Sequence, residues 1–308
     1  MKKLFCFIAL LLLMGCSNTN SNKELSIVVP SGAPSLAFYS EKDNPLFNTA
    51  DASSIIPELM SDNGSDVIVV DTVNGVKAIN SGANYSLAAS ITFGNFYLAS
   101  TGNDEDGIMN EGDYIVLFSK GATPDLIFHY LFKDKYDSSI HYVSAVSDAS
   151  ACLIKGINIS DDSSKVDYVM IAEPALTMAL SQNEKASVYL DIQNEYKKTS
   201  GGMPMIQASI FVSNKLEKKD IENFLSKIKE NINFILDNPN IFSDSVANMS
   251  DTEVKDLFGI PNSKIAYKVL KENSIGLGFI DAYNNKDNID QYLSLFDIGE
   301  TNEEIYFK

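Results

Sequence analysis

The sequence contains no arginine, and it has only two histidines and three cysteines. All 24 basic residues are therefore lysines, so no guanidinium fork is available to grip a carboxylate, phosphate or sulfonate in a bidentate manner. Acidic residues number 41, which gives a formal net charge of −17. This acidic balance argues against nucleic-acid binding, which requires a basic face.

The scarcity of histidine and cysteine also limits the chemistry that we expect. His129 falls within a predicted helix and His141 at the start of a predicted strand, and neither has the spacing of a metal ligand. The G-x-S-x-G, P-loop and H-E-x-x-H motifs are absent. We therefore predict that the chain is not an enzyme and has no catalytic residue, cofactor or metal site.

The first fifteen residues have the pattern of an export signal. Lys2 and Lys3 precede an apolar run over residues 4–14, which is shorter than the roughly 20 residues of a membrane span. The following segment, Leu13-Met14-Gly15-Cys16, resembles the bacterial lipobox. The resemblance implies cleavage before Cys16 and a lipid on its thiol, whereas an ordinary secretory signal is the alternative. Residues 16–23 would then be a polar tether that holds the protein on the outer face of the bacterial cytoplasmic membrane.

Removal of residues 1–15 has three consequences for the rest of the chain. It leaves 293 of the 308 residues, which is enough for two lobes of ordinary domain size, and it takes the formal charge to −19. Cys6 leaves with the signal and Cys16 carries the lipid, so Cys152 has no partner for an internal disulfide. No segment of the remaining chain reaches the length of a membrane span.

Short apolar runs alternate with helical patterns along the first two thirds of the chain. The predicted strands cover residues 25–30, 65–71, 85–100 (as one strand or two), 114–119, 140–145, 167–171, 188–192 and 205–212. The predicted helices cover residues 34–39, 73–79, 124–132, 148–155 and 173–182. This alternation is typical of βαβ units in an α/β protein.

The last third of the chain is predicted to be mainly helical. Apolar residues recur every three or four positions, as in an amphipathic helix, at Ile221, Leu225, Ile228, Ile232 and Ile235. Asn238-Pro239 ends this pattern. Shorter helices are expected near residues 251–258, 263–272 and 286–296.

Five segments, taken in order, resemble a known family. They are IVVPSGAPSLAFY, DVIVVDTVNGVKAINSG, LFSKGATPDLIFHYLF, DYVMIAEPALTMAL and MIQASIFVSNKL. The chain resembles the type II periplasmic substrate-binding proteins of ABC importers, in the branch that serves nitrate, sulfonates, taurine and thiamine-precursor pyrimidines. The resemblance covers roughly residues 24–308.

The resemblance implies two α/β lobes, each a mixed sheet flanked by helices, joined by two crossover strands with the ligand between them. Lobe one would comprise residues 24–93 and 203–308, and lobe two residues 94–202. The crossovers would lie near residues 92–97 and 198–205. The implied partners are a small-molecule ligand and an ABC permease with its ATPase, and the protein would be a monomer held at the membrane only by its lipid.

Ligands of open α/β sheets bind beyond the carboxyl ends of the strands, where helix N-termini offer free N–H groups. Three predicted loops occupy such positions, and each of their residues has a turn or helix cap as its structural alternative. The candidates for ligand binding are Ser31, Gly32, Ala33, Ser35, Asp71, Thr72, Ser119, Lys120, Gly121 and Thr123.

Glu173 and two aromatic residues complete the predicted ligand site. Glu173 would place a carboxylate at a strand end, which suits an amine or a ring N–H of a ligand, although an acidic residue before Pro174 is also a good helix cap. Phe93 and Phe96 lie near the first crossover, where they stack on a flat ligand or belong to the core. Both a nitrogenous heterocycle and a sulfonate- or nitrate-type anion stay open as ligands.

We therefore expect a solute-binding lipoprotein that delivers a small molecule to an ABC importer. A sensory or adhesive surface lipoprotein with the same fold is the alternative. An enzyme family that forms pyrimidines shares the fold that this resemblance implies, but those enzymes rely on a histidine and a cysteine-rich motif that this sequence lacks.

Overall fold

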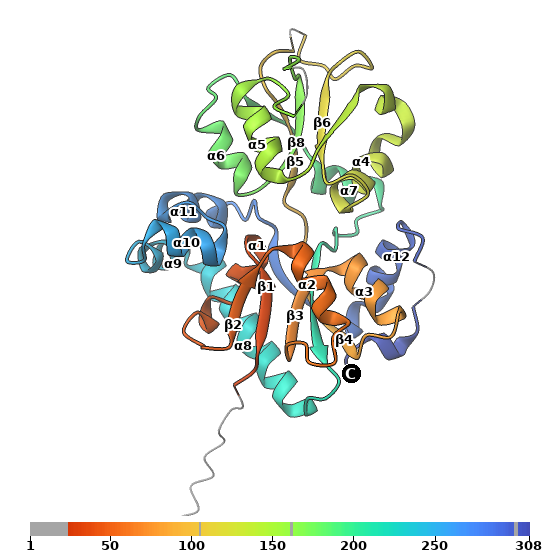
Figure 1. The fold of residues 1–308 in the computed structure, drawn as a ribbon, viewed down its shortest axis with the longest axis vertical. Coiled ribbons are helices and arrows are strands. Elements are labelled where there is room, and N and C mark those ends of the chain that lie inside the picture. The colour runs from red at the N-terminus through yellow and green to blue at the C-terminus, as the bar shows by residue number, and fades with distance from the viewer. Residues whose placement is uncertain (1–23, 105, 161–162, 299–300) are drawn as a thin grey trace, which may run out of the picture.

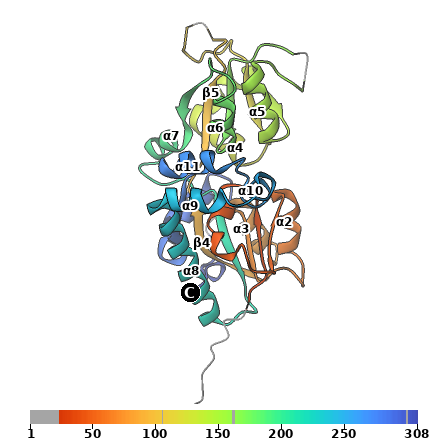
Figure 2. The ribbon, with the colours of Figure 1, turned by 90° about the vertical axis from the view of Figure 1, so that its left-hand side faces the viewer.

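The computed structural model describes residues 24–104, 106–160, 163–298 and 301–308 (Figure 1). The predicted signal peptide, Cys16 and the tether lie outside these ranges. No helix within the described ranges is long and apolar enough to cross a membrane. Figure 1, and Figure 2 in a view turned by 90°, show two lobes stacked along the long axis, and each lobe contains its own β-sheet.

Lobe one is built on a six-stranded sheet in the order β11-β4-β10-β3-β1-β2. Its strands are β1 (Ile27–Pro30), β2 (Phe47–Ala50), β3 (Val67–Asp71), β4 (Tyr85–Thr92), β10 (Ala208–Ser213) and β11 (Leu277–Asp281). β1 pairs in parallel with β2 and β3, whereas β10 runs antiparallel to β3 and β4 and β11 runs antiparallel to β4. The sheet is therefore mixed.

Helices cover both faces of this sheet because its strands are apolar on both sides. Val67 and Val69 belong to one core cluster and Ile68 and Val70 to the other, as the alternation of side chains along a strand requires. One face packs against α1 (Ala33–Leu36), α8 (Lys218–Asp237), α9 (Pro239–Val246), α10 (Asp251–Phe258) and α11 (Ser263–Lys271). The other face packs against α2 (Ala52–Leu59), α3 (Thr72–Asn80) and α12 (Lys286–Ser294).

Lobe two is built on a five-stranded sheet in the order β7-β6-β8-β5-β9. Its strands are β5 (Phe96–Ser100), β6 (Ile115–Phe118), β7 (Ile140–Val143), β8 (Tyr168–Ala172) and β9 (Ser187–Asp191). Its helices are α4 (Thr123–Phe132), α5 (Val146–Lys155), α6 (Ala175–Leu180) and α7 (Ile192–Thr199). β6 is parallel to β7 and β8, and β5 is antiparallel to β8 and β9, so this sheet is also mixed.

Two connections join the lobes, as predicted. Residues 93–95 lead from β4 to β5, and residues 200–207 lead from α7 to β10. The connections lie side by side, because the backbone N–H of Gln207 donates to the carbonyl of Thr92 at 3.0 Å. The prediction of an α/β fold with two helix-flanked mixed sheets joined by two crossovers is confirmed.

The stretch over residues 85–100, expected as one strand or two, forms two strands, one in each sheet, separated at Gly94, whose φ is 95°. Several other local features differ from the sequence-based expectation. Pro239 ends α8 but also begins α9, since proline is well tolerated in the first turn of a helix. The helix expected over residues 34–39 is limited to the short α1. The sequence pattern also does not predict β2, α2, α7 or β11, and β11 is hidden by Gly276 and Gly278.

Candidate ligand site between the lobes

The facing edges of the two sheets carry the strand ends that precede helices. In lobe one these are the carboxyl ends of β1 and β3, and in lobe two they are the carboxyl ends of β6, β8 and β9 (Figure 1). The short β–α loops therefore meet between the lobes. This is the position where open α/β sheets bind their ligands.

A hydrogen bond between Asp71 and Thr123 spans the two lobes at this position. Asp71 caps α3, because its Oδ1 accepts from the backbone N–H of Asn74 at 3.1 Å. Its second oxygen, Oδ2, accepts from Thr123 Oγ1 at 2.5 Å. Thr123 is the first residue of α4 and is buried. The structure thus brings together two residues that the sequence placed in the site, one from each lobe.

The charge of Asp71 is poorly compensated. Burial raises the pKa of the Asp71 carboxyl above its usual value, and the hydrogen bonds from Thr123 and Asn74 and the charge of Lys77 oppose this rise only in part. No lysine or histidine of the described chain forms an ion pair with Asp71. The carboxylate between the lobes therefore lacks a cationic partner within the described protein.

Tyr292 of α12 lies beside Asp71 and Thr123. Its side chain is fully buried, and its hydroxyl has no hydrogen-bond partner among the described residues. Burial raises the pKa of the Tyr292 hydroxyl well above its usual value, and the negative charge of Asp71 raises it further. Thr123 opposes this rise in part. Its proton is directed to Asp71, and although its oxygen keeps lone pairs, the Tyr292 hydroxyl forms no hydrogen bond within the described residues.

A second buried tyrosine meets Tyr292 from the opposite lobe. Tyr196 of α7 is fully buried, and its ring lies edge-on to that of Tyr292 at a centroid distance of 6.0 Å. The Tyr196 hydroxyl also has no hydrogen-bond partner in the described ranges. A buried polar atom without a partner is costly, so unpaired hydroxyls on both lobes mark this region as unusual.

The second crossover adds further polar atoms to the same edge of lobe one. Gln207 Nε2 donates to Asn95 Oδ1 at 2.9 Å, and the carbonyl of Gln207 accepts from the N–H of Thr72 at 3.0 Å. Gln207 Oε1 and the buried Thr92 Oγ1 have no hydrogen-bond partner within the part of the chain that the structure describes. This edge therefore offers an unused acceptor at Gln207 Oε1 and an unused hydroxyl at Thr92.

A cavity of about 520 Å³ lies between α6 and α11, next to the first crossover. Phe93 and Glu173 line it, together with Tyr97 and Ser274. Both oxygens of the Glu173 carboxylate are engaged: they accept from the N–H of Thr177 at 2.9 Å and from its hydroxyl at 2.7 Å, so Glu173 holds the start of α6. Ser274 of lobe one donates to the same carboxylate at 3.2 Å.

The predicted loop after β1 directs its hydroxyls to the protein. Ser31 is exposed, and its Oγ donates to the carbonyl of Asp256 at the end of α10 at 3.2 Å. Ser35 is buried and donates to the carbonyl of Gly32 at 2.8 Å. Ala33 is buried at the start of α1. Neither hydroxyl lies among the residues that converge on Asp71.

The predicted loop after β6 is likewise held by local contacts. Ser119 donates its hydroxyl to the loop that follows β7. The exposed Lys120 places its Nζ 4.8 Å from the centre of the Tyr142 ring. The N–H of Gly121 donates to Asp125 Oδ2 at 2.7 Å. Among the described residues, Thr123 is the member of this loop that forms a hydrogen bond with lobe one, through Asp71.

The two remaining predicted residues are buried within single lobes. Thr72 Oγ1 is 2.7 Å from Ser209 Oγ, in a polar chain inside lobe one. Phe96 is 4% exposed, and its ring packs edge-on against Phe118 of lobe two. Sequence reasoning did not identify Tyr196, Gln207 or Tyr292. The helix that carries Tyr196 was not predicted, and Tyr292 lies on an apolar helix face that is typical of core.

The two histidines have partners within lobe two. His129 Nε2 lies 3.3 Å from Asp125 Oδ1 and its Nδ1 lies 3.4 Å from Asp137 Oδ1. The ring of His141 stacks on Tyr114 at a centroid distance of 3.6 Å. Within the described ranges, no three His, Cys, Asp or Glu side chains are grouped so as to hold a metal ion.

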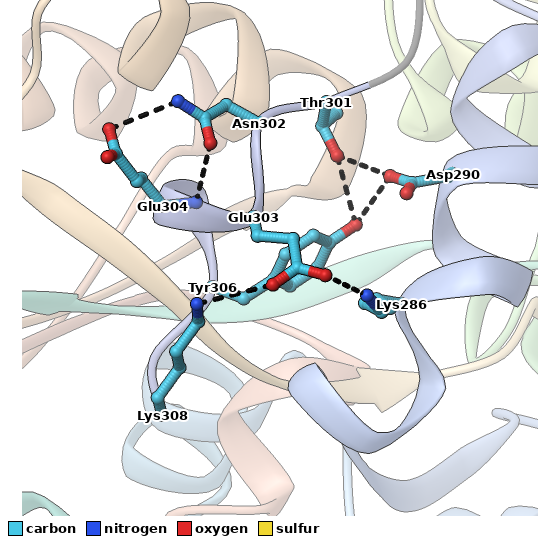
Figure 3. Close-up of polar contacts among 8 residues, drawn as sticks. All are labelled: Lys286, Asp290, Thr301, Asn302, Glu303, Glu304, Tyr306 and Lys308. Atoms are coloured by element: carbon cyan, nitrogen blue, oxygen red, sulfur yellow. Dashed lines mark hydrogen bonds and ion pairs between the residues drawn. The ribbon is translucent and has the colours of Figure 1, made fainter.

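Polar contacts of the C-terminal residues hold α12, which carries Tyr292, against the sheet of lobe one (Figure 3). Tyr306 donates its hydroxyl to Asp290 Oδ1 of α12 at 2.6 Å, and Glu303 forms ion pairs with Lys286 of α12 and with Lys308. The backbone N–H of Phe307 donates to the carbonyl of Leu87 on β4 at 3.0 Å. The end of the chain is thereby tied both to the sheet and to the helix that carries Tyr292.

No protein-family model matches the chain, and no curated protein matches it. Solved structures do match. An ABC transporter protein from Parabacteroides distasonis is 18% identical with a TM-score of 0.69, over 88% of this chain and 91% of that one. The periplasmic aliphatic sulphonate binding protein SsuA from Escherichia coli is 16% identical with a TM-score of 0.60, over 88% and 85%. A Candida albicans protein, described as having the generic periplasmic binding protein fold, is 11% identical with a TM-score of 0.56, over 91% of both chains. The chain therefore has the fold of the type II periplasmic binding proteins.

Proposed function

We propose that this protein is an extracytoplasmic solute-binding lipoprotein that captures a small molecule between its lobes and delivers it to an ABC importer. The observation that carries the proposal is the meeting of Asp71 and Thr123 across the lobes, beside unpaired buried hydroxyls. A cavity of about 520 Å³ elsewhere on the same lobe boundary, lined by Phe93 and Glu173 rather than by Asp71, supports it, because ligand sites usually occupy roughly 300 to 1,000 Å³.

The two adjacent crossovers support a capture mechanism by hinge closure. One lobe would bind the ligand first, and closure would add contacts from the second lobe. Residues 93–95 and 200–207 are the hinge segments in this mechanism, since they are the connections that join the two sheets. The permease with its ATPase would recognise the closed form.

The membrane anchor is part of the same proposal. The segment Leu13-Met14-Gly15-Cys16 supports a lipid on Cys16, and a tether of residues 16–23 would keep the protein close to its permease. This arrangement places the protein on the outer face of the bacterial cytoplasmic membrane.

A ligand screen tests the binding function. Thermal melts would be recorded with nitrate, sulfonates including taurine, aminopyrimidines, polyamines, primary amines and amino acids, each at millimolar concentration. We expect at least one class to raise the melting temperature, because a ligand that binds only the folded state stabilises it. If no compound stabilises the protein, the binding function is rejected.

Uptake then separates transport from the sensory alternative. Cells that lack this protein should lose high-affinity uptake of the compound found in the screen. Unchanged uptake, combined with tight binding by the purified protein, would favour a sensory or adhesive surface lipoprotein.

A further inference from the structure

We propose that the ligand carries a positively charged N–H donor, an ammonium or amidinium group, which binds Asp71 beside Thr123 and Tyr292. This inference rests on the proposed function and narrows its ligand from two open classes to one. It is carried by three features of the described residues: a carboxylate without an ion pair, buried oxygens without hydrogen bonds, and starts of α3 and α4 where carboxylates already accept the N–H groups.

The first feature is the carboxylate of Asp71. It accepts hydrogen bonds from Asn74 and Thr123, but it has no ion pair within the described ranges. Lys77 is exposed in the last turn of α3, and its charge opposes the raised pKa of Asp71 only in part. A partly buried charge without an ion pair is destabilising, and a cation supplied by the ligand would reduce that cost.

The second feature is a pair of buried oxygens without hydrogen bonds, one beside this carboxylate and one on the neighbouring crossover. Tyr292 is 0% exposed, and its hydroxyl, which can both donate and accept, lies beside Asp71 and Thr123 without a hydrogen-bond partner among the described residues. The amide nitrogen of Gln207 is already used on Asn95, so its unpaired atom is the acceptor oxygen Oε1. An ammonium or amidinium group offers several N–H bonds to such oxygens.

The third feature opposes an anion at the same position. A helix start attracts anions when its N–H groups are free. Here carboxylates already accept N–H groups at four of the helix starts near the lobe boundary: Asp71 from Asn74, Asp125 from Gly121 just before α4, Glu173 from Thr177 and Asp191 from Asn194. The start of α1 has no side-chain cap, but the hydroxyls of its loop do not contact Asp71.

The lysine of the loop that precedes Thr123 does not reverse this balance. Lys120 is exposed and lies over the ring of Tyr142 rather than against Asp71. A sulfonate or nitrate at this position would therefore meet carboxylates and acceptor oxygens, whereas an ammonium group would meet complementary charge.

The test sorts the compounds of the ligand screen by charge. It adds four probes that share a phenyl ring and differ in their polar group: benzylamine, benzamidine, benzyl alcohol and phenylmethanesulfonate. Dissociation constants would be measured by calorimetry for the wild type and for Asp71→Asn, which keeps a good helix cap but removes the charge. We expect the tightest compound to be an N–H cation, and Asp71→Asn to weaken it about tenfold or more.

Two further variants keep the test decisive. Tyr292→Phe removes only the unpaired hydroxyl and should weaken the same compound about threefold or more. Asp66→Asn makes the same charge change at the opposite end of β3, where Asp66 accepts from Ser26, and should leave the affinity unchanged.

The possible failures are distinguishable. If sulfonates or nitrate bind most tightly, or if Asp71→Asn leaves the affinity for the best amine unchanged, this inference is overturned and the proposed function stands. If no compound of any charge binds, the proposed function itself fails and the inference fails with it.

Discussion

Thr123 Oγ1 donates a 2.5 Å hydrogen bond to Asp71 Oδ2, and this bond joins two sheets that share no strand. The donor begins a helix of lobe two, and the acceptor ends a strand of lobe one. The bond therefore exists only while the lobes are close together. A change at either residue should alter both the candidate ligand site and the contact between the lobes.

Asp71→Asn should stabilise the ligand-free protein at neutral pH. The pKa of Asp71 is raised in the folded state, so the stability that this group contributes is fully present below its unfolded value of about 4. That contribution is lost as the pH rises through the folded pKa. The uncharged asparagine avoids the loss, and we expect the melting temperature at pH 7 to rise by about 2 °C or more.

Thermal melts across the pH range check this prediction. The advantage of Asp71→Asn over the wild type should shrink as the pH falls and disappear once the carboxyl of Asp71 is protonated in both states. A variant that melts below the wild type at neutral pH would contradict the account of Asp71 as a destabilising charge.

Gly276→Ala should strain the contact between β11 and the first crossover. A Cβ at this position would lie 1.9 Å from the carbonyl oxygen of Gly94, and the φ of Gly276 is +63°. We expect the free energy of unfolding, measured with urea, to fall by about 2 kcal/mol or more. Gly107→Ala is the matched control. The φ of Gly107 is +70°, but an added Cβ would have no atom within 4 Å apart from those of the adjacent residues. Equal losses in the two variants would show that the clash is unimportant.

Glu173→Gln should weaken the start of α6. Thr177 donates two hydrogen bonds to this carboxylate and Ser274 donates a third from lobe one. Loss of a charged cap usually costs about 1 kcal/mol, which chemical unfolding would measure. Calorimetry with the identified ligand would test the second role proposed for Glu173, and an unchanged dissociation constant would remove Glu173 from the site.

Cys16→Ser should release the protein from the membrane. A serine cannot form the thioether to the lipid, so the exported chain should move from the membrane fraction to the medium or the soluble fraction. Immunoblots of fractionated cells measure this directly, with the wild type as the control. Continued association with the membrane would reject the lipid anchor.

Much of the fold follows from local patterns in the sequence. The β-branched run Val67–Asp71 forms the predicted buried strand, and the stripe that begins at Ile221 forms the buried face of α8. These patterns are readable because a strand with two buried faces and a helix with one apolar face leave distinct periodicities. By contrast, β11 is a strand only through its pairing with β4, since Gly276 and Gly278 oppose that assignment locally.

The candidate site is predictable only in part. Asp71 and Thr123 follow apolar strands, so their position at a sheet edge can be read from the sequence. Their hydrogen bond cannot, because it depends on how the two lobes approach each other. Tyr292 is still harder to find: with Ile289, Leu293 and Phe296 it forms an ordinary apolar helix face, and its unpaired hydroxyl becomes evident only beside Asp71.

The adjacency of β4 and β10 bears on how the chain is made. Lobe two is a continuous stretch of polypeptide inserted between two neighbouring strands of lobe one, whose ends are joined by the contact between Gln207 and Thr92. If the exported chain emerges from its N-terminus, lobe two can complete its sheet once β9 has emerged. Lobe one must wait for β10 and β11, and its half-built sheet has an open edge at β3 and β4 until then. The inserted lobe is therefore complete before the lobe that surrounds it, and slow emergence of residues 208–281 should prolong the time during which that edge is open to aggregation.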